Sequence, residues 1–289
     1  MFLMRLTLTL ALLMTFSLTH AQERISYAYK TLSGASESLD AVITKISVDG
    51  KRPAVVILHH SGGWEAGTNK QYVELLSQNG FIAIEPILFR KPTKTTYGES
   101  LAKAMGAINY LSTRADVDMS NVSVIGTSYG ANLSVFMATQ WAHKNFLPEQ
   151  IKIHKVVALY PVCWFYPKLI KHDTNSWFFK ERLKDLPIDM MDNWANIPMK
   201  LFAAGQDDYS GKDATVCPEF KEALPSEVQK ALTSVVVYPD ATHGWDQGRT
   251  FSFHEPAACK SMGCTNTNAF NPNVTAQAKN ELLIFLQKD

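Results

Sequence analysis

The chain has little net charge and no excess of glycine or proline. Its 289 residues carry 28 Lys and Arg against 27 Asp and Glu, a formal net charge of +1. Because the chain has almost no excess of positive charge to attract a phosphate backbone, we do not expect nucleic-acid binding. Fifteen glycines and 13 prolines without a repeat exclude a collagen-like fibre. Hydrophobic residues make up 46% of the chain and charged ones 19%, which excludes a disordered chain.

The chain also lacks an apolar run of membrane-spanning length. The run at 6–18 follows Arg5 and is interrupted by three Thr and one Ser, whereas a spanning helix needs roughly 20 apolar residues. It closes on Thr19-His20-Ala21, whose small first and last residues are typical of signal-peptide cleavage. We therefore expect residues 1–21 to be a secretory signal peptide and 22–289 to be a single domain. The mature protein would be periplasmic or secreted, without stable membrane insertion.

Cysteine is scarce, and all four cysteines follow the predicted leader: Cys163, Cys217, Cys259 and Cys264. An even number in an oxidising compartment favours disulfides, and four cysteines allow three pairings. Cys259 and Cys264 bracket a short Gly-bearing loop, while Cys163 and Cys217 each follow a predicted strand. We predict the pairs 163–217 and 259–264. Buried free thiols and a zinc site are the alternatives, although no Cys-x-x-Cys spacing supports zinc.

Apolar runs of strand length alternate with longer helical patterns along the whole mature chain. The predicted strands are 25–30, 39–47, 54–59, 81–85, 122–125, 156–160, 200–204 and 234–238, and the predicted helices are 68–79, 97–113, 129–143, 215–223 and 275–287. Several strands are continuously apolar, as expected where both faces are covered. This alternation predicts an α/β fold with a mainly parallel sheet of about eight strands and helices on both faces. In such sheets ligands bind beyond the carboxyl ends of the strands.

The motif Gly126-Thr127-Ser128-Tyr129-Gly130 lies between a predicted strand and a predicted helix. A Gly-x-Ser-x-Gly turn at this place holds a nucleophilic serine on a tight, strained bend, where side chains beside it would crowd the turn. We interpret Ser128 as a catalytic nucleophile. The alternative is an ordinary glycine-rich turn.

A serine hydroxyl needs a base that a carboxylate orients, and both partners are expected after later strands in the order acid, then histidine. Asp207 and Asp208 follow the strand at 200–204, and His243 follows the strand at 234–238 with Gly244 beside it. We expect His243 to be the base, against the alternative of a solvated loop histidine. Either aspartate could be the acid, and the other would then be a surface or loop-capping carboxylate.

Acyl transfer also requires N–H donors for the developing oxyanion. The amide of Tyr129 follows the nucleophile directly, and Ser61 lies in the glycine-bearing turn after the strand at 54–59. We expect these two amides to form the oxyanion hole. A metal centre of His59, His60 and Asp207 is a competing idea, but adjacent side chains on an extended segment point to opposite faces. No cofactor is expected, because no nucleotide-binding glycine pattern is present.

Taken together, these motifs resemble the α/β-hydrolase superfamily and, within it, the dienelactone hydrolase family. The residues that carry the resemblance are His59-His60-Ser61-Gly62-Gly63-Trp64, Gly80-Phe81-Ile82-Ala83-Ile84-Glu85-Pro86, Gly126 to Gly130, Tyr160-Pro161-Val162-Cys163, Ala204-Gly205-Gln206-Asp207-Asp208-Tyr209 and Thr242-His243-Gly244-Trp245. The family acid follows directly on a Gly-x-x or Gly-Gly-x turn, and Ala204-Gly205-Gln206 resembles that turn, which implies Asp207 as the acid. Exported relatives with Tyr-Pro-x-Cys and a later Cys also support a 163–217 bridge.

The chain differs from the type enzymes of the family at two positions of the site. The type enzymes use a Cys nucleophile where this chain has Ser128, and a Glu where it has His60. Activity on dienelactone itself is therefore not implied, but ester or lactone hydrolysis is. Substrate-binding candidates are Trp64 in the oxyanion turn, together with Arg90 and Arg249, by analogy with family arginines that bind a substrate carboxylate.

The connection at 163–197 is rich in aromatic residues and Met, and insertions at this place in the fold often cap the active site. A packed satellite core is the alternative. The sequence thus predicts an exported serine hydrolase that acts on small-molecule esters or lactones. No motif in the sequence indicates a protein partner. The alternatives are a peptidase or acyltransferase with the same triad and a non-catalytic binding protein.

Overall fold

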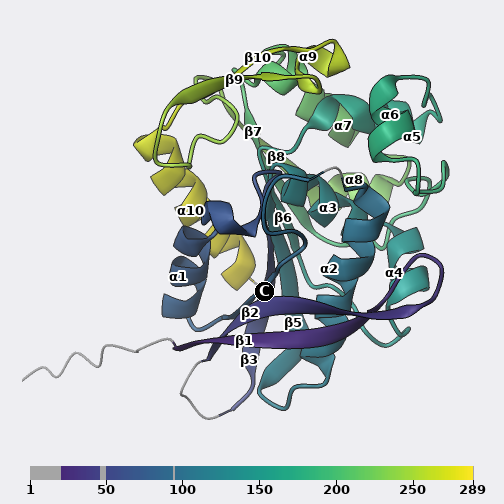
Figure 1. Ribbon diagram of the computed structural model, residues 1–289, viewed down its shortest axis with the longest axis vertical. Helices are drawn as coiled ribbons and strands as arrows, with labels where there is room; N and C mark the ends of the chain where they lie inside the picture. Colours follow the sequence, from purple (N-terminus) through teal and green to yellow (C-terminus); the bar gives the residue numbers. More distant parts are fainter. Residues whose placement is uncertain (1–20, 46–49, 94, 289) are drawn as a thin grey trace, which may run out of the picture.

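The computed structural model describes residues 21–45, 50–93 and 95–288, so that of the predicted signal peptide only Ala21 is described. Its centre is an eight-stranded sheet in the order β1-β2-β4-β3-β5-β6-β7-β8 (Figure 1). The strands are β1 (Ala21–Lys30), β2 (Ser36–Lys45), β3 (Arg52–Leu58), β4 (Ile82–Pro86), β5 (Val117–Thr127), β6 (Val156–Leu159), β7 (Met199–Ala204) and β8 (Thr233–Tyr238). β2 pairs antiparallel with both β1 and β4, and every neighbouring pair from β4 to β8 is parallel. The predicted α/β fold is confirmed.

Helices cover both faces of this sheet. They are α1 (Lys70–Gln78), α2 (Tyr97–Ser112), α3 (Tyr129–Met137), α4 (Gln140–Phe146), α5 (Tyr166–Ile170), α6 (Trp177–Arg182), α7 (Val216–Ala223), α8 (Glu227–Leu232), α9 (Ala258–Ser261) and α10 (Pro272–Gln287). α1 and α10 pack on one face, and α2 and α3 pack on the other (Figure 1). The five residues 54–58 of β3 are fully buried because helices cover them from both sides.

The helix predicted at 129–143 is two helices. α3 ends at Met137, and Thr139 adopts an extended conformation (φ −76°, ψ 147°) before α4 begins. The Thr139 hydroxyl donates to Phe136 O at 2.8 Å and accepts the Ala142 N–H at 3.2 Å. A threonine that bonds local backbone in this way competes with the helix and starts a new one.

Two segments enclose the carboxyl end of the sheet. The first is the connection at 163–197, which contains α5 and α6 and is called the cap segment here after its predicted role. The second is a hairpin of β9 (Phe251–Glu255) and β10 (Cys264–Asn268), joined through α9 (Figure 1). One disulfide joins Cys163 at the start of the cap segment to Cys217 of α7, and another closes the hairpin loop between Cys259 and Cys264. These are the predicted pairs.

The helices described at 21–45, 50–93 and 95–288 include none with the length and hydropathy needed to cross a bilayer.

Candidate active site

Ser128 lies on the sharp turn between β5 and α3, with a left-handed backbone conformation of φ 51° and ψ −111°. The two flanking glycines make this turn sterically feasible. A Cβ at Gly126 would lie 2.0 Å from Gly130 O, and one at Gly130 would lie 2.2 Å from Leu58 O. The strained serine turn predicted from the motif is therefore present.

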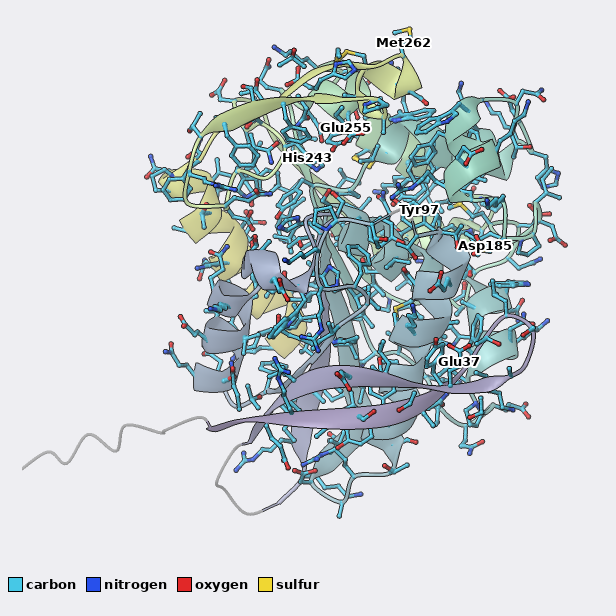
Figure 2. All side chains as sticks on the ribbon, in the orientation of Figure 1. Glu37, Tyr97, Asp185, His243, Glu255 and Met262 are labelled. Carbon is cyan, nitrogen blue, oxygen red and sulfur yellow. A yellow bond between two sulfur atoms is a disulfide. The ribbon has the colours of Figure 1, made fainter. Side chains whose placement is uncertain are left out.

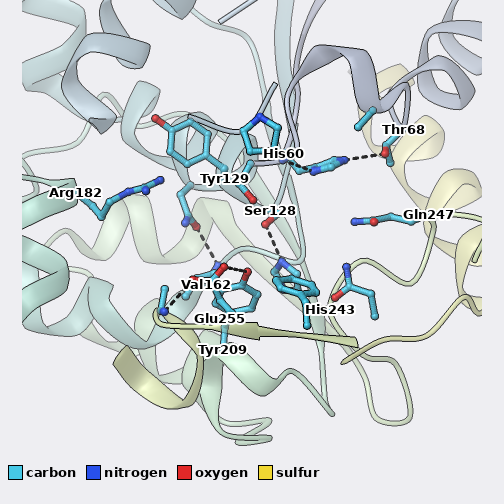
Figure 3. A pocket seen from close by; sticks show the side chains of 18 of the residues that line it. His60, Thr68, Ser128, Tyr129, Val162, Arg182, Tyr209, His243, Gln247 and Glu255 are labelled. Carbon is cyan, nitrogen blue, oxygen red and sulfur yellow. Dashed lines mark hydrogen bonds between the residues drawn. The ribbon is translucent and has the colours of Figure 1, made fainter. Parts of the chain in front are cut away.

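Ser128, His243 and Asp207 meet above the carboxyl ends of β5, β8 and β7. His243 Nε2 is 2.7 Å from Ser128 Oγ (Figure 3). Its Nδ1 is 2.8 Å from Asp207 Oδ2. All three residues are buried. Because a carboxylate only accepts hydrogen bonds, Nδ1 carries the imidazole proton, which leaves Nε2 free to accept the proton of the serine hydroxyl.

Asp208 has other partners and is buried, so the surface position, one of its two expected places, is wrong. Its Oδ2 accepts the Thr267 N–H of β10 at 2.8 Å, and its Oδ1 lies 3.7 Å from Lys212 Nζ. Asp207 and Asp208 thus have separate tasks. The first orients the histidine, and the second fastens the β9–β10 hairpin to the end of β7.

The turn after β3 brings Ser61 to the site, and the start of α3 brings Tyr129. Neither amide N–H donates to an acceptor within the described ranges. His60 supports the turn: its Nδ1 accepts the Gly62 N–H at 2.9 Å, so its Nε2 donates to Thr68 Oγ1 at 2.8 Å (Figure 3). Burial lowers the pKa of His60 to about 4, which keeps this ring neutral.

A pocket of about 740 Å³ opens over Ser128. Two of its walls are the cap segment, which contributes Trp177, Phe178 and Arg182, and the hairpin, which contributes Phe251, Phe253 and Glu255. In the view of Figure 3, Arg182 lies to the left of Ser128 and Glu255 lies below it and to the left. Aromatic walls with a few convergent polar groups are typical of small-molecule sites.

The three residues proposed for substrate binding have different positions. Arg249 lines the pocket, whereas Trp64 and Arg90 do not. The Trp64 ring lies 5.6 Å from the Arg24 guanidinium, and Arg90 forms an ion pair with Asp40 at 3.3 Å. Both side chains contact residues of β1 or β2 and do not line the space above Ser128, so we assign neither of them a substrate contact.

Sequence reasoning missed a buried network below His243. Asp246 accepts hydrogen bonds from the hydroxyls of Tyr72 at 2.5 Å and Tyr160 at 2.8 Å. The Tyr160 ring in turn contacts the His243 ring at 5.1 Å between centroids. Burial raises the pKa of Asp246, and the two tyrosine hydrogen bonds oppose that shift. The only available signal was that Asp246 stands three residues after His243 in the same loop.

Residues 56–246 match the alpha/beta hydrolase fold family, and the protein belongs to this family because the match covers more than half of the chain. A search of curated proteins finds no match. Among solved structures, a protein of Klebsiella pneumoniae subsp. pneumoniae, provisionally described as a dienelactone hydrolase, is similar over 92% of this chain and 100% of its own, with TM-score 0.62 and 15% identity.

Two further structures show the range of the fold. The Pyrobaculum calidifontis esterase is similar over 93% of this chain and 85% of its own, with TM-score 0.60 and 15% identity. The Pyrococcus horikoshii acylaminoacyl peptidase is similar over 77% of this chain but only 38% of its own, with TM-score 0.53 and 16% identity. At such identities these similarities show the fold alone.

Proposed function

We propose that the protein is an exported serine hydrolase that cleaves carboxylic esters or lactones, working as a single domain over residues 22–289. The observation that carries the proposal is the chain of two hydrogen bonds from Asp207 through His243 to Ser128, buried beneath a pocket large enough for a small organic substrate. The solved esterase and the provisional dienelactone hydrolase that share the fold agree with this choice of substrate.

In the proposed reaction Ser128 Oγ attacks the ester carbonyl carbon while His243 Nε2 takes the hydroxyl proton. The Tyr129 and Ser61 amides stabilise the oxyanion of the tetrahedral intermediate. His243 then returns the proton to the leaving alcohol as the carbon–oxygen bond breaks, which leaves an acyl-enzyme. A water molecule, deprotonated by His243, attacks this acyl group, and the acid product leaves with Ser128 restored. Asp207 keeps the proton of the resting imidazole on Nδ1 throughout.

We also propose that the protein acts outside the cytoplasm. The predicted signal peptide at 1–21 supports this, and so do the two disulfides, because such bonds persist in oxidising compartments. Thiol counting of the unreduced protein tests the proposal, with zero free thiols expected. Four free thiols in protein exported by its native host would contradict it.

A panel of p-nitrophenyl esters, lactones and aminoacyl amides tests the reaction class. We expect turnover of esters or lactones, its loss in Ser128→Ala, and no loss in Ser112→Ala, which removes an exposed serine hydroxyl at the end of α2. The melting temperature of Ser128→Ala should stay within a few degrees of the parent. Turnover of amides alone would replace the esterase assignment with a peptidase. An acceptor-dependent product would point to an acyltransferase.

A further inference from the structure

The cap segment is held at its start by the Cys163–Cys217 disulfide, and a second attachment lies farther along. Asp185, just after α6, reaches across to the amino end of α2. Its Oδ1 accepts the Gly98 N–H at 3.2 Å, its Oδ2 accepts the Glu99 N–H at 3.0 Å, and the Thr96 hydroxyl donates to Oδ2 as well. Figure 2 labels Asp185 and Tyr97 at this junction.

These contacts satisfy a need of α2 itself. The first N–H groups of a helix have no partner within the helix, and a side chain at the N-cap position usually accepts from them. Thr96 occupies that position but makes no such bond. Asp185, more than 80 residues away in sequence, accepts from them instead. A carboxylate at this place is also stabilised by the positive end of the helix dipole.

The same junction touches the wall of the pocket. Tyr97, the first residue of α2, stacks on Tyr129 with centroids 4.4 Å apart, and the Tyr129 hydroxyl donates to Thr96 O at 2.9 Å. On the cap side Phe178 and Arg182 line the pocket, and the Arg182 guanidinium lies 5.8 Å from the centroid of the Tyr129 ring. A shift of Asp185 would therefore move the wall that faces the residue next to Ser128.

We propose that Asp185 is a specificity-determining positioning residue. Its carboxylate latches the cap segment to the amino end of α2 and thereby fixes the distance between the cap wall and Ser128. Esters with a group large enough to reach that wall depend on the latch, and methyl acetate does not. This inference rests on the proposed function, because it concerns how that site selects its substrates.

The test uses three variants and a control in the full-length mature protein. Asp185→Ala removes every latch contact, and Asp185→Asn keeps an acceptor oxygen. Gly98→Ala displaces the carboxylate from the other side, since its Cβ would lie 2.7 Å from Asp185 Cγ and 2.8 Å from Leu32 Cδ1. Alanine favours helix more than glycine does, so weaker helix formation cannot explain an effect of Gly98→Ala. The matched control is Asp189→Ala, which removes an exposed carboxylate from the same segment.

Steady-state kinetics would be measured with two ester series. One varies the acyl group (p-nitrophenyl acetate, butyrate and octanoate), and the other varies the alcohol of an acetate (methyl and phenyl). In at least one series we expect Asp185→Ala to raise KM for the largest ester about tenfold, equivalent to about 1.4 kcal/mol, with kcat nearly unchanged. Methyl acetate kinetics should not change. Gly98→Ala should act in the same direction, Asp185→Asn should have a smaller effect, and Asp189→Ala should have none.

Hydrogen–deuterium exchange provides a readout that does not depend on turnover. Residues 171–190 should exchange faster in Asp185→Ala and Gly98→Ala, while β5 and β6 keep their protection. Equal losses for all esters including methyl acetate would overturn the proposal, as would unchanged exchange at 171–190 or an equal effect of Asp189→Ala. If the parent protein turned over no ester, the proposed function would fail, and the exchange experiment would still decide whether the latch exists.

Discussion

Replacing Asp207 with asparagine should nearly abolish turnover, for a reason visible in its two hydrogen bonds. Oδ1 accepts the Tyr209 N–H at 2.9 Å, and Oδ2 accepts the His243 Nδ1–H at 2.8 Å. In the asparagine variant the amide oxygen must face the Tyr209 N–H, which leaves the NH2 group against the imidazole. That group donates to Nδ1 and forces the ring proton onto Nε2, where it blocks proton transfer from Ser128.

The expected loss in kcat is about 10⁴-fold, as in other triads that hold the wrong histidine tautomer. This equals about 5.5 kcal/mol of lost transition-state stabilisation. Asp208→Asn is the matched control, because its amide oxygen can still accept the Thr267 N–H and only the ion pair with the half-exposed Lys212 is lost. A loss below about fivefold is expected there, since an ion pair 3.7 Å long with a solvent-exposed lysine contributes at most about 1 kcal/mol.

The assay is kcat at saturating concentration of the best ester in the panel, with purified variants whose melting temperatures are recorded alongside. A similar loss in the two variants, or a larger loss in Asp208→Asn, would refute the assignment of Asp207 as the acid.

Three further predictions concern stability, each measured by urea unfolding. Gly126→Ala should lower the unfolding free energy by about 1 to 3 kcal/mol, because its methyl group would overlap the backbone of α3; an unchanged midpoint would contradict this. Tyr160→Phe should cost about 1 to 3 kcal/mol by leaving the buried Asp246 carboxylate one donor short, and a neutral result would show that Asp246 does not need this bond. Burial raises the pKa of Glu85 to about 7, above its value in the unfolded chain. The folded state keeps a proton that the unfolded state releases, so the free energy of unfolding falls as the pH rises toward and through 7. The difference in unfolding free energy between Glu85→Gln and the parent should therefore grow by about 2 kcal/mol in favour of the variant from about pH 5.5 to pH 8.5. A difference that does not change with pH would rule out the raised pKa of Glu85.

The parallel part of the sheet was predictable because several of its strands are continuous apolar runs. All eight predicted strands occur in the structure, since a buried parallel strand such as β3 needs hydrophobic side chains on both faces. The residues brought together at Ser128 were predictable for a related reason. In a parallel sheet the carboxyl ends of the strands meet at one edge, so chain order could place His243 and an acid at 207 or 208. The choice of Asp207 came from the family resemblance.

What could not be predicted depends on individual side-chain contacts, most of them between distant segments. The β9–β10 hairpin is short and largely polar, and it is held by the Asp208 bond to Thr267, which no periodicity reveals. The break at Thr139 follows from a side-chain hydrogen bond that competes with the helix. Trp64 and Arg90 fit a motif by position, but neighbouring charges on β1 and β2 engage their side chains.

The central claim is that Ser128 is an activated nucleophile, and labelling with a fluorophosphonate tests it most directly. The folded protein would be incubated with the probe, and the modified peptide would be identified by mass spectrometry. We expect one probe per molecule on Ser128, with no labelling in Ser128→Ala and strongly slowed labelling in His243→Ala. A natively folded protein that never reacts, or that reacts only at another residue, would contradict the account.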